Sequence, residues 1–215
     1  MSDLPPSIFD ELDEAKVKIL FKDLQRRSYV KNSFVINAGD NSDCVYLIKS
    51  GKVKIVILDD EGKEVILSIL GSGDHFGELS LIDGQPRSAS AVTMEESILL
   101  IVSKDQFRKC LAENPDVAER VMISLAQRLR EADRKIEGLA LLDVYSRLVR
   151  TLSELSMEQD GKLILPQRLT HQDLANMIGA SREMITRILR DLATGGYISI
   201  ENREITLLKK LPSSW

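Results

Sequence analysis

The 215-residue chain has few aromatic residues, few cysteines and few histidines. Phe, Trp and Tyr make up only 5% of it, so the 43% of hydrophobic residues must build a mainly aliphatic core. Its two cysteines, Cys44 and Cys110, have neither the spacing of a metal site nor the number needed for a disulfide framework. We therefore expect two buried free thiols and a reduced, cytoplasmic protein.

Long apolar runs and signal sequences are also missing. No run is long enough to cross a bilayer, and the first six residues contain neither a basic nor an apolar signal region. We therefore predict no association with a membrane. The net charge of −4 does not suggest a nucleic-acid-binding protein, but from Pro166 onward seven basic residues stand against five acidic ones. This asymmetry favours contact with DNA at the C-terminal end only.

Two patterns fill the N-terminal half. Residues 8–24 have the apolar spacing of a short amphipathic helix. Between Ser33 and about Val102, short β-rich runs alternate with glycine-containing turns, which predicts an antiparallel barrel or roll. The predicted strands cover residues 34–36, 45–48, 53–57, 65–69 and 98–102.

A long helix is predicted from Asn114 toward Leu139. Its apolar residues are spaced close to a heptad and are flanked by charges, which favours a dimer seam. The alternative is that this stripe packs on the protein's own roll, as the apolar face of a surface helix does. The stripe consists of Ala118, Val121, Leu125, Leu129, Ala132, Ile136 and Leu139.

The C-terminal third combines short helices with a hairpin. After a junction at residues 139–144, Asp143 is a natural N-cap for a helix over residues 144–155. Residues 157–162 have the composition of a polar loop. Two alternating runs, 197–200 and 204–207, predict a β-hairpin that would form a wing.

The segment around Gly179 has the layout of a helix-turn-helix. One face of the helix that follows is apolar and the opposite face carries arginines and a carboxylate, as in a DNA-reading helix. Arginine can donate two bonds to guanine and a carboxylate can accept from cytosine, so this face can read a G·C step. The alternative is a solvated helix with a Glu183–Arg187 ion pair. The apolar face comprises Ile185, Ile188, Leu189 and Leu192, and the polar face Arg182, Glu183, Arg187 and Arg190.

The loop at residues 73–81 is a candidate phosphate site. Gly77 permits close approach of the backbone, and free N–H groups at the start of a following helical turn favour an anion. Arg87 and Ser88 would add a fixed positive charge and a hydroxyl, and Glu78 can accept from a sugar hydroxyl. The set suits a cyclic phosphate with an attached ribose. The alternative is a tight turn with an Arg87–Glu78 ion pair.

Several motifs, in this order, resemble the cyclic-AMP receptor protein family, whose superfamily includes the fumarate–nitrate regulator. The resemblance covers nearly the whole chain. It implies an α+β fold with an N-terminal antiparallel β-roll that binds a cyclic nucleotide, a long dimerisation helix and a C-terminal winged helix-turn-helix. The implied domain limits are 1–113, 114–142 and 143–215. The motifs are residues 62–68, 76–79, 87–89 and 139–144, and Ser181-Arg182-Glu183 with Arg187.

The resemblance also implies the roles of individual residues. Thr170 has an alternative role at the start of its own helix, because residues 170–173 match a capping box. The implied nucleotide-binding residues are Ser68, Leu70, Phe76, Gly77, Glu78, Leu79, Arg87, Ser88, Ala89, Ala132 and Asp133. The implied DNA-binding residues are Thr170, His171, Gln172, Ser181, Arg182, Glu183 and Arg187.

The chain departs from the family at two positions of the long helix. Relatives that bind cyclic AMP present a Thr-Ser or Thr-Asn pair to the adenine amine, where this chain has Ala132 and Asp133. A carboxylate can accept from the adenine amine, but it can also accept two bonds from guanine N1–H and the guanine amine. Cyclic AMP is the expected effector, with cyclic GMP or cyclic di-GMP as alternatives. Pairing of Asp133 with Arg130 or Arg134 on a solvated face also remains open.

The expected protein is a homodimeric transcription regulator that reads a two-fold, TGTGA-like site on double-stranded DNA, with RNA polymerase as a partner. The alternative is a nucleotide sensor whose C-terminal domain binds protein. No nucleophile–base pair, metal spacing or P-loop motif is present, so an enzyme is not expected. No metal, haem or iron–sulfur cluster is expected either. No cysteine precedes Cys44, and a haem would need His171 or His75, which we interpret as a loop residue.

Overall fold

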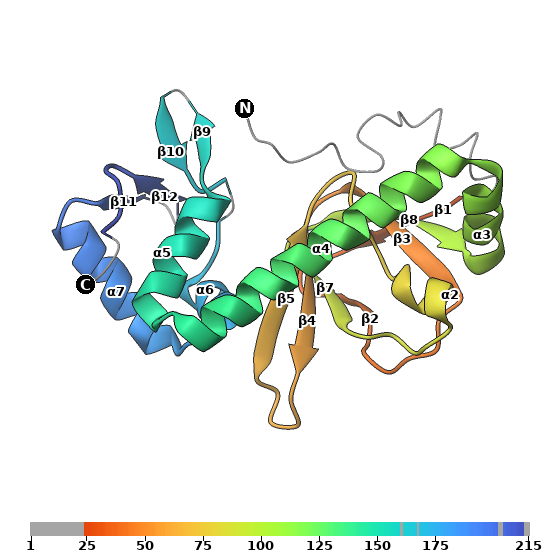
Figure 1. The fold of residues 1–215 in the computed structure, drawn as a ribbon, viewed down its shortest axis with the longest axis horizontal. Helices are drawn as coiled ribbons and strands as arrows, with labels where there is room; N and C mark the ends of the chain where they lie inside the picture. Colours follow the sequence, from red (N-terminus) through yellow and green to blue (C-terminus); the bar gives the residue numbers. More distant parts are fainter. Residues whose placement is uncertain (1–23, 160, 167, 202–203, 213–215) are drawn as a thin grey trace. The chain divides into compact units, whose positions relative to one another are not determined.

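The computed structural model describes residues 24–159, 161–166, 168–201 and 204–212. The helix predicted at residues 8–24 lies outside this part of the chain, apart from its last residue. Two compact units divide the chain, one reaching to Arg130 and the other beginning at Glu131. Figure 1 shows the strands of the first unit and the helices of the second, and each unit is described by itself below.

Two four-stranded antiparallel sheets form the first unit, in the orders β1-β8-β3-β6 and β2-β7-β4-β5. This arrangement confirms the predicted roll, and all five predicted strands are present. The strands are β1 (Gln25–Tyr29), β2 (Phe34–Ile36), β3 (Cys44–Ser50), β4 (Val53–Leu58), β5 (Glu64–Leu70), β6 (His75–Phe76), β7 (Ser90–Thr93) and β8 (Ser97–Ser103).

The sequence analysis missed β1, β6 and β7, each for a physical reason. β1 has the sequence QRRSY and is exposed over four of its five residues, because among the described strands it lies at the edge of its sheet and pairs with β8 alone. Such a strand carries no alternation of apolar and polar residues. β7 has the sequence SAVT and is buried throughout, so its small side chains do not alternate either. β6 has only two residues, too few to show any period.

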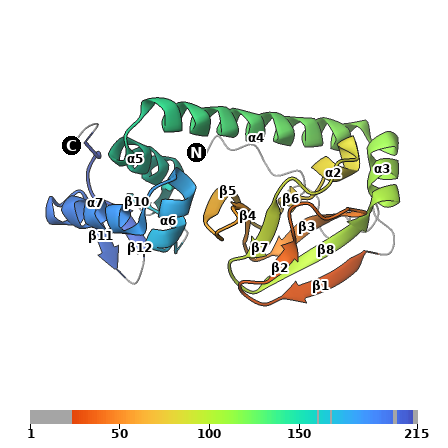
Figure 2. The same cartoon turned by 90° about the horizontal axis from the view of Figure 1, so that it is seen from below.

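Two short helices close one end of the roll. α2 (Leu79–Asp83) and α3 (Lys104–Glu113) lie near each other there (Figures 1 and 2). Arg108 Nη2 of α3 donates to Leu81 O of α2 at 3.1 Å. Phe107 and Cys110 of α3 belong to the core of the roll. The prediction of buried free thiols is therefore confirmed for Cys110, whereas Cys44 is only half-buried.

The apolar stripe of α4 (Pro115–Leu141) is divided between two environments. Val121 is 3% exposed and lies in the core of the roll, with Leu125 packed against that core. Packing on the roll, the alternative to a dimer seam, is therefore confirmed for this first part. Leu129 and Ile136 are instead 64% and 65% exposed. Among the described helices, α4 included, none combines the length and apolar character needed to cross a membrane.

The second unit is a helix-turn-helix with a small sheet. Asp143 caps α5 (Val144–Leu155) by accepting a bond of 2.7 Å from Ser146 N, as predicted. The other elements are α6 (His171–Ile178), α7 (Arg182–Thr194), β9 (Met157–Gln159), β10 (Lys162–Ile164), β11 (Ile198–Glu201) and β12 (Glu204–Leu207). β11 and β12 pair antiparallel, which confirms the predicted hairpin.

The prediction of a polar loop over residues 157–162 was wrong. β9 and β10 form a second hairpin there, and β10 pairs with β12 so that Leu163 lies opposite Leu207. The sheet order is therefore β11-β12-β10-β9. The polar composition misled the prediction because β9 is an edge strand whose three residues are all exposed.

Arg147 joins three segments of the second unit. Its Nη1 donates to Leu142 O at 2.8 Å, just beyond the end of α4. Its Nε donates to Ile178 O at 3.0 Å, at the end of α6. Arg150, one turn later on α5, pairs with Glu137 of α4 at 3.2 Å. The last turn of α4 is thereby fixed to the helix-turn-helix.

We predict that Val121→Ala lowers the free energy of unfolding by about 1–3 kcal/mol, because it removes two buried methyl groups and leaves a cavity. Val30→Ala is the matched control: Val30 is 73% exposed, so the same deletion should cost less than about 0.5 kcal/mol. Urea unfolding of the full chain, followed by circular dichroism at one protein concentration, measures both. Equal effects would contradict the packing of α4 on the roll.

Candidate functional site

The loop after β6 requires glycine at residue 77. Gly77 has φ of +85°, a backbone conformation that side chains rarely adopt. A Cβ atom there would also lie 2.2 Å from Arg87 Nη1. The group that approaches Gly77 is the guanidinium of Arg87, and close approach of a phosphate to its backbone stays a prediction.

Arg87 is a buried cation in a fixed position. Its Nη1 donates to Gly77 O at 2.5 Å and its Nη2 donates to Cys44 O at 2.7 Å. Its Cζ lies 5.9 Å from the centre of the Tyr46 ring, which stacks on Phe76. These two bonds use two of the five N–H groups of arginine, so others can bind an anion. The burial of an unbalanced charge is costly and favours a bound anion.

Glu78 is the most deeply buried carboxylate beside this loop, with 1% of its surface exposed. Its Oε1 accepts from Arg128 Nη1 of α4 at 2.8 Å, and Arg128 Nη2 also donates to His75 O at 2.5 Å. Its Oε2 is buried and has no hydrogen-bond partner among the described residues. The alternative of an Arg87–Glu78 ion pair was therefore wrong, since the partner of Glu78 is Arg128. The unpaired oxygen is suited to accept from a ligand hydroxyl.

The interpretation of His75 as a loop residue was wrong. His75 lies in β6, pairs with Leu47 of β3 and is 2% exposed. Burial, assisted by the charge of Arg128, lowers the pKa of its imidazole to about 3. The ring is therefore neutral near pH 7, and its 3.9 Å approach to Glu78 Oε2 is not an ion pair.

The other residues predicted to bind nucleotide differ in exposure. Leu70, Phe76 and Ala89 are buried, and Ser68 is half-buried in β5. The exposed ones are Leu79, Ser88, Ala132 and Asp133. The structure thus brings Gly77, Glu78 and Arg87 together in one buried polar cluster. Sequence reasoning missed Arg128, which lies fifty residues from Glu78 and carries no local signal.

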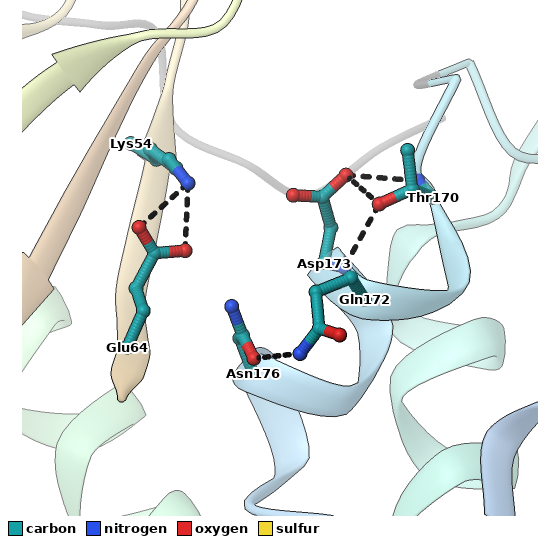
Figure 3. A network of polar contacts seen from close by, with 6 residues as sticks. All are labelled: Lys54, Glu64, Thr170, Gln172, Asp173 and Asn176. Atoms are coloured by element: carbon teal, nitrogen blue, oxygen red, sulfur yellow. Dashed lines mark hydrogen bonds and ion pairs between the residues drawn. The ribbon is translucent and has the colours of Figure 1, made fainter. Parts of the chain in front are cut away.

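Side-chain caps stabilise the N-terminal ends of both helices of the helix-turn-helix. Thr170 and Asp173 form the predicted capping box: Thr170 Oγ1 accepts from Asp173 N at 3.0 Å, and Asp173 Oδ2 accepts from Thr170 N at 2.8 Å. Figure 3 shows this box at the start of α6, with Gln172 Nε2 donating to Asn176 Oδ1 at 2.7 Å. Thr170 therefore stabilises its own helix, and its contact with DNA stays a prediction.

Helix α7 has the predicted two faces. Gly179 ends α6 with φ of +65°, and Ser181 caps α7 by accepting from Met184 N at 3.2 Å. The apolar face is buried and the residues expected to read bases are exposed: Arg182, Glu183 and Arg187. The alternative Glu183–Arg187 ion pair does not form in this described segment. Arg187 instead contacts the sulfur of Met184 at 2.9 Å.

The two helices are joined by a bond that sequence reasoning missed. His171 Nδ1 lies 2.9 Å from Thr186 Oγ1, so α6 and α7 meet through polar side chains as well as through their apolar faces. Fifteen residues separate the two partners, and no periodic pattern links them. His171 had been assigned to DNA, but Thr186 had no assigned role.

Each half of the chain matches a known protein family. Residues 26–114 match the cyclic nucleotide-binding domain, and residues 146–211 match the Crp-like helix-turn-helix domain. A CRP-like cAMP-activated global transcriptional regulator of Mycobacterium tuberculosis is 33% identical over 204 residues, which cover 93% of this chain and 91% of that protein. The chain belongs to the CRP/FNR family of transcription regulators.

Two further members of the family show how far the likeness extends. The cyclic AMP receptor protein of Thermus thermophilus is 34% identical over 209 residues, 95% of each chain. The structure of the c-di-GMP responsive global regulator CLP of Xanthomonas campestris superposes with a TM-score of 0.78 at 29% identity, covering 92% of this chain and all of that one. The predicted family and fold class are confirmed. These relatives are transcription regulators and not enzymes, as expected for this chain.

We predict that Gly77→Ala weakens the binding of cyclic nucleotide at least about tenfold, a loss of about 1.4 kcal/mol, because the new methyl group displaces the Arg87 guanidinium. Gly62→Ala is the matched control, since Gly62 has a similar φ of +78° but nothing within 4 Å of a Cβ. It should show the same backbone strain without the loss of binding. Calorimetric titration with cyclic AMP and with cyclic GMP measures the nucleotide affinity of both variants. Unchanged affinity in Gly77→Ala would show that the close approach is not part of the site.

Proposed function

We propose that this cyclic-nucleotide-responsive CRP/FNR regulator is a homodimer whose nucleotide-bound form reads a two-fold, TGTGA-like DNA site. The observation that carries the proposal is the buried cluster at the loop after β6. Arg87 offers donors to a cyclic phosphate, and Glu78 offers one unpaired oxygen to a ribose hydroxyl. Arg87 and Glu78 together match the cyclic phosphate and the ribose hydroxyl, which every cyclic nucleotide presents.

Cyclic AMP is the proposed effector. It is supported by the names of the two curated relatives, a cAMP-activated regulator and a cyclic AMP receptor protein. Cyclic GMP and cyclic di-GMP remain the alternatives, the second because the X. campestris neighbour responds to it. Ala132 and Asp133 would face the base, and only the carboxylate of Asp133 can bind it, as an acceptor.

The proposed dimer would use the exposed part of the α4 stripe. Leu129, Ile136 and Leu139 are 64%, 65% and 57% exposed, and a second copy of the helix would remove them from water. Two recognition helices related by a two-fold axis would then enter DNA major grooves about 34 Å apart. RNA polymerase is the proposed partner at the promoter.

The proposed reading of DNA assigns two kinds of contact. Arg182 and Arg187 would bond guanine, and Glu183 would accept from cytosine. Phosphate contacts would come from the capped ends of α6 and α7: Thr170, His171, Gln172 and Ser181. A C-terminal unit that binds protein instead of DNA would shift no duplex in a sequence-dependent way, and this separates the two functions.

We predict that Arg187→Ala weakens binding to a TGTGA-type duplex by about 1–3 kcal/mol and reduces the preference for that sequence over its mutated versions. Arg190→Ala is the control on the same exposed face of α7. It lies outside the assigned base readers, so it should weaken binding to all duplexes alike. Fluorescence anisotropy with saturating cyclic nucleotide, at one salt concentration, measures both. An Arg187→Ala protein that loses the same affinity on random DNA would refute its assignment to a base.

We predict that Asp133→Ala weakens nucleotide binding by about 1.5–3 kcal/mol, because it removes a charged acceptor from the base. Glu131→Ala is the control, since it removes an exposed carboxylate two residues away on α4. Thermal shift and calorimetry with cyclic AMP, cyclic GMP and cyclic di-GMP identify the effector at the same time. If Asp133→Ala keeps both its affinity and its DNA response to nucleotide, the residue does not contact the base.

A further inference from the structure

His171 is held between the two helices of the helix-turn-helix by a side chain of the recognition helix. Thr186 Oγ1 lies 2.9 Å from Arg182 O and 2.9 Å from His171 Nδ1. Thr186 stands on α7 one turn after Arg182, and His171 is the first residue of α6. The hydroxyl therefore joins the backbone of the recognition helix to an imidazole at the start of the preceding helix.

The two bonds together determine which nitrogen of His171 carries a proton. A threonine hydroxyl has one proton, and Thr186 donates it to the carbonyl of Arg182. The same oxygen can then only accept from His171, so Nδ1 must be the protonated nitrogen. Nε2 is left with its lone pair, on the part of the ring that does not face Thr186. A second proton would convert Nε2 from an acceptor into a charged donor.

The surroundings of His171 disfavour that second proton in the absence of DNA. Burial of the half-exposed ring, and then the charge of Arg182, lower the pKa of His171 below its ordinary value of 6.5. Arg182 is the charged group that acts on it from α7. On α6 the carboxylate of Asp173 is engaged by Thr170, and on α5 Arg147 is bonded to the opposite end of α6.

We propose that His171 is a proton-linked contact to the DNA backbone, in which Nε2 takes up a proton from solvent as it binds a phosphate while Thr186 holds Nδ1. The inference rests on the proposed function, because it assigns the chemistry of one of its phosphate contacts. A DNA phosphate supplies the negative charge that the free protein lacks at this position. The bound imidazolium then donates from both nitrogens, one bond to DNA and one to the recognition helix.

The sign of the linkage follows from the two states. DNA favours the protonated form, so the pKa of His171 is higher in the complex than in the free protein. Affinity for DNA then rises as the pH falls through the pKa that His171 has in the complex. It levels off below the pKa that His171 has in the free protein, which lies under 6.5. A difference of one pKa unit makes binding about tenfold tighter for each histidine, or about a hundredfold for a dimer with two.

The test compares four proteins on one TGTGA-type duplex between pH 8.0 and pH 5.5, at constant ionic strength and saturating cyclic nucleotide. Wild type should bind more tightly as the pH falls. His171→Asn keeps an N–H near the Nδ1 position but has no titrating nitrogen, so its affinity for DNA should stay constant from pH 8.0 to pH 5.5. His171→Arg should bind tightly at every pH. Thr186→Val should reduce the gain, because Nδ1 loses its partner.

A second readout observes the proton directly. The chain has two histidines, and His75 with a pKa of about 3 does not titrate in this range. The single titrating imidazole in the NMR spectrum should therefore be His171, with a higher pKa in the DNA complex than in the free protein. The inference is overturned if that pKa does not rise on DNA binding, or if His171→Asn keeps the pH dependence of wild type. Either of these results would leave sequence-specific binding to DNA intact. If the proposed function were wrong, sequence-specific binding would instead be absent at every pH.

Discussion

The bond between Arg128 and Glu78 is the interaction on which the nucleotide-binding unit depends. Glu78 is almost fully buried, and a carboxylate in that position needs a positive partner. Arg128 provides it from α4 and also bonds the backbone of His75, so the loop, the strand β6 and the long helix are held at one point. One carboxylate oxygen is thereby neutralised and the other is kept available. In the proposed site, a ligand hydroxyl would pair with the second oxygen, which has no partner among the described residues.

Arg87 has a complementary role. Its guanidinium is fixed by two carbonyl oxygens, which orient a cation without neutralising it. The glycine at residue 77 is required because this cation lies where a side chain would begin. In the proposed site, the loop would bind an anion through a group that is positioned before the ligand arrives, so little conformational freedom would be lost on binding. The neutral His75 fits this arrangement, because a second cation beside Arg128 would compete for the same carboxylate.

Local signals were enough to predict most of the fold. Asp143, Gly179 and the alternating run 204–207 each act on their immediate neighbours, so their effects can be read from a few residues. The same holds for Gly77 and Arg87, which lie close together in sequence. Arg128 and Thr186 could not be found in this way, since each bonds to a residue far along the chain. Edge strands such as β9 were missed because solvent, and not a core, sets their composition.

The bonds of Arg147 have a mechanical consequence. Because this side chain joins Leu142 to the end of α6, and Arg150 joins α5 to Glu137, the final turn of α4 is fixed to α5 and α6. The residues next to Leu142 are therefore not a loose linker, and a rotation of that turn would carry α5 and the end of α6 with it.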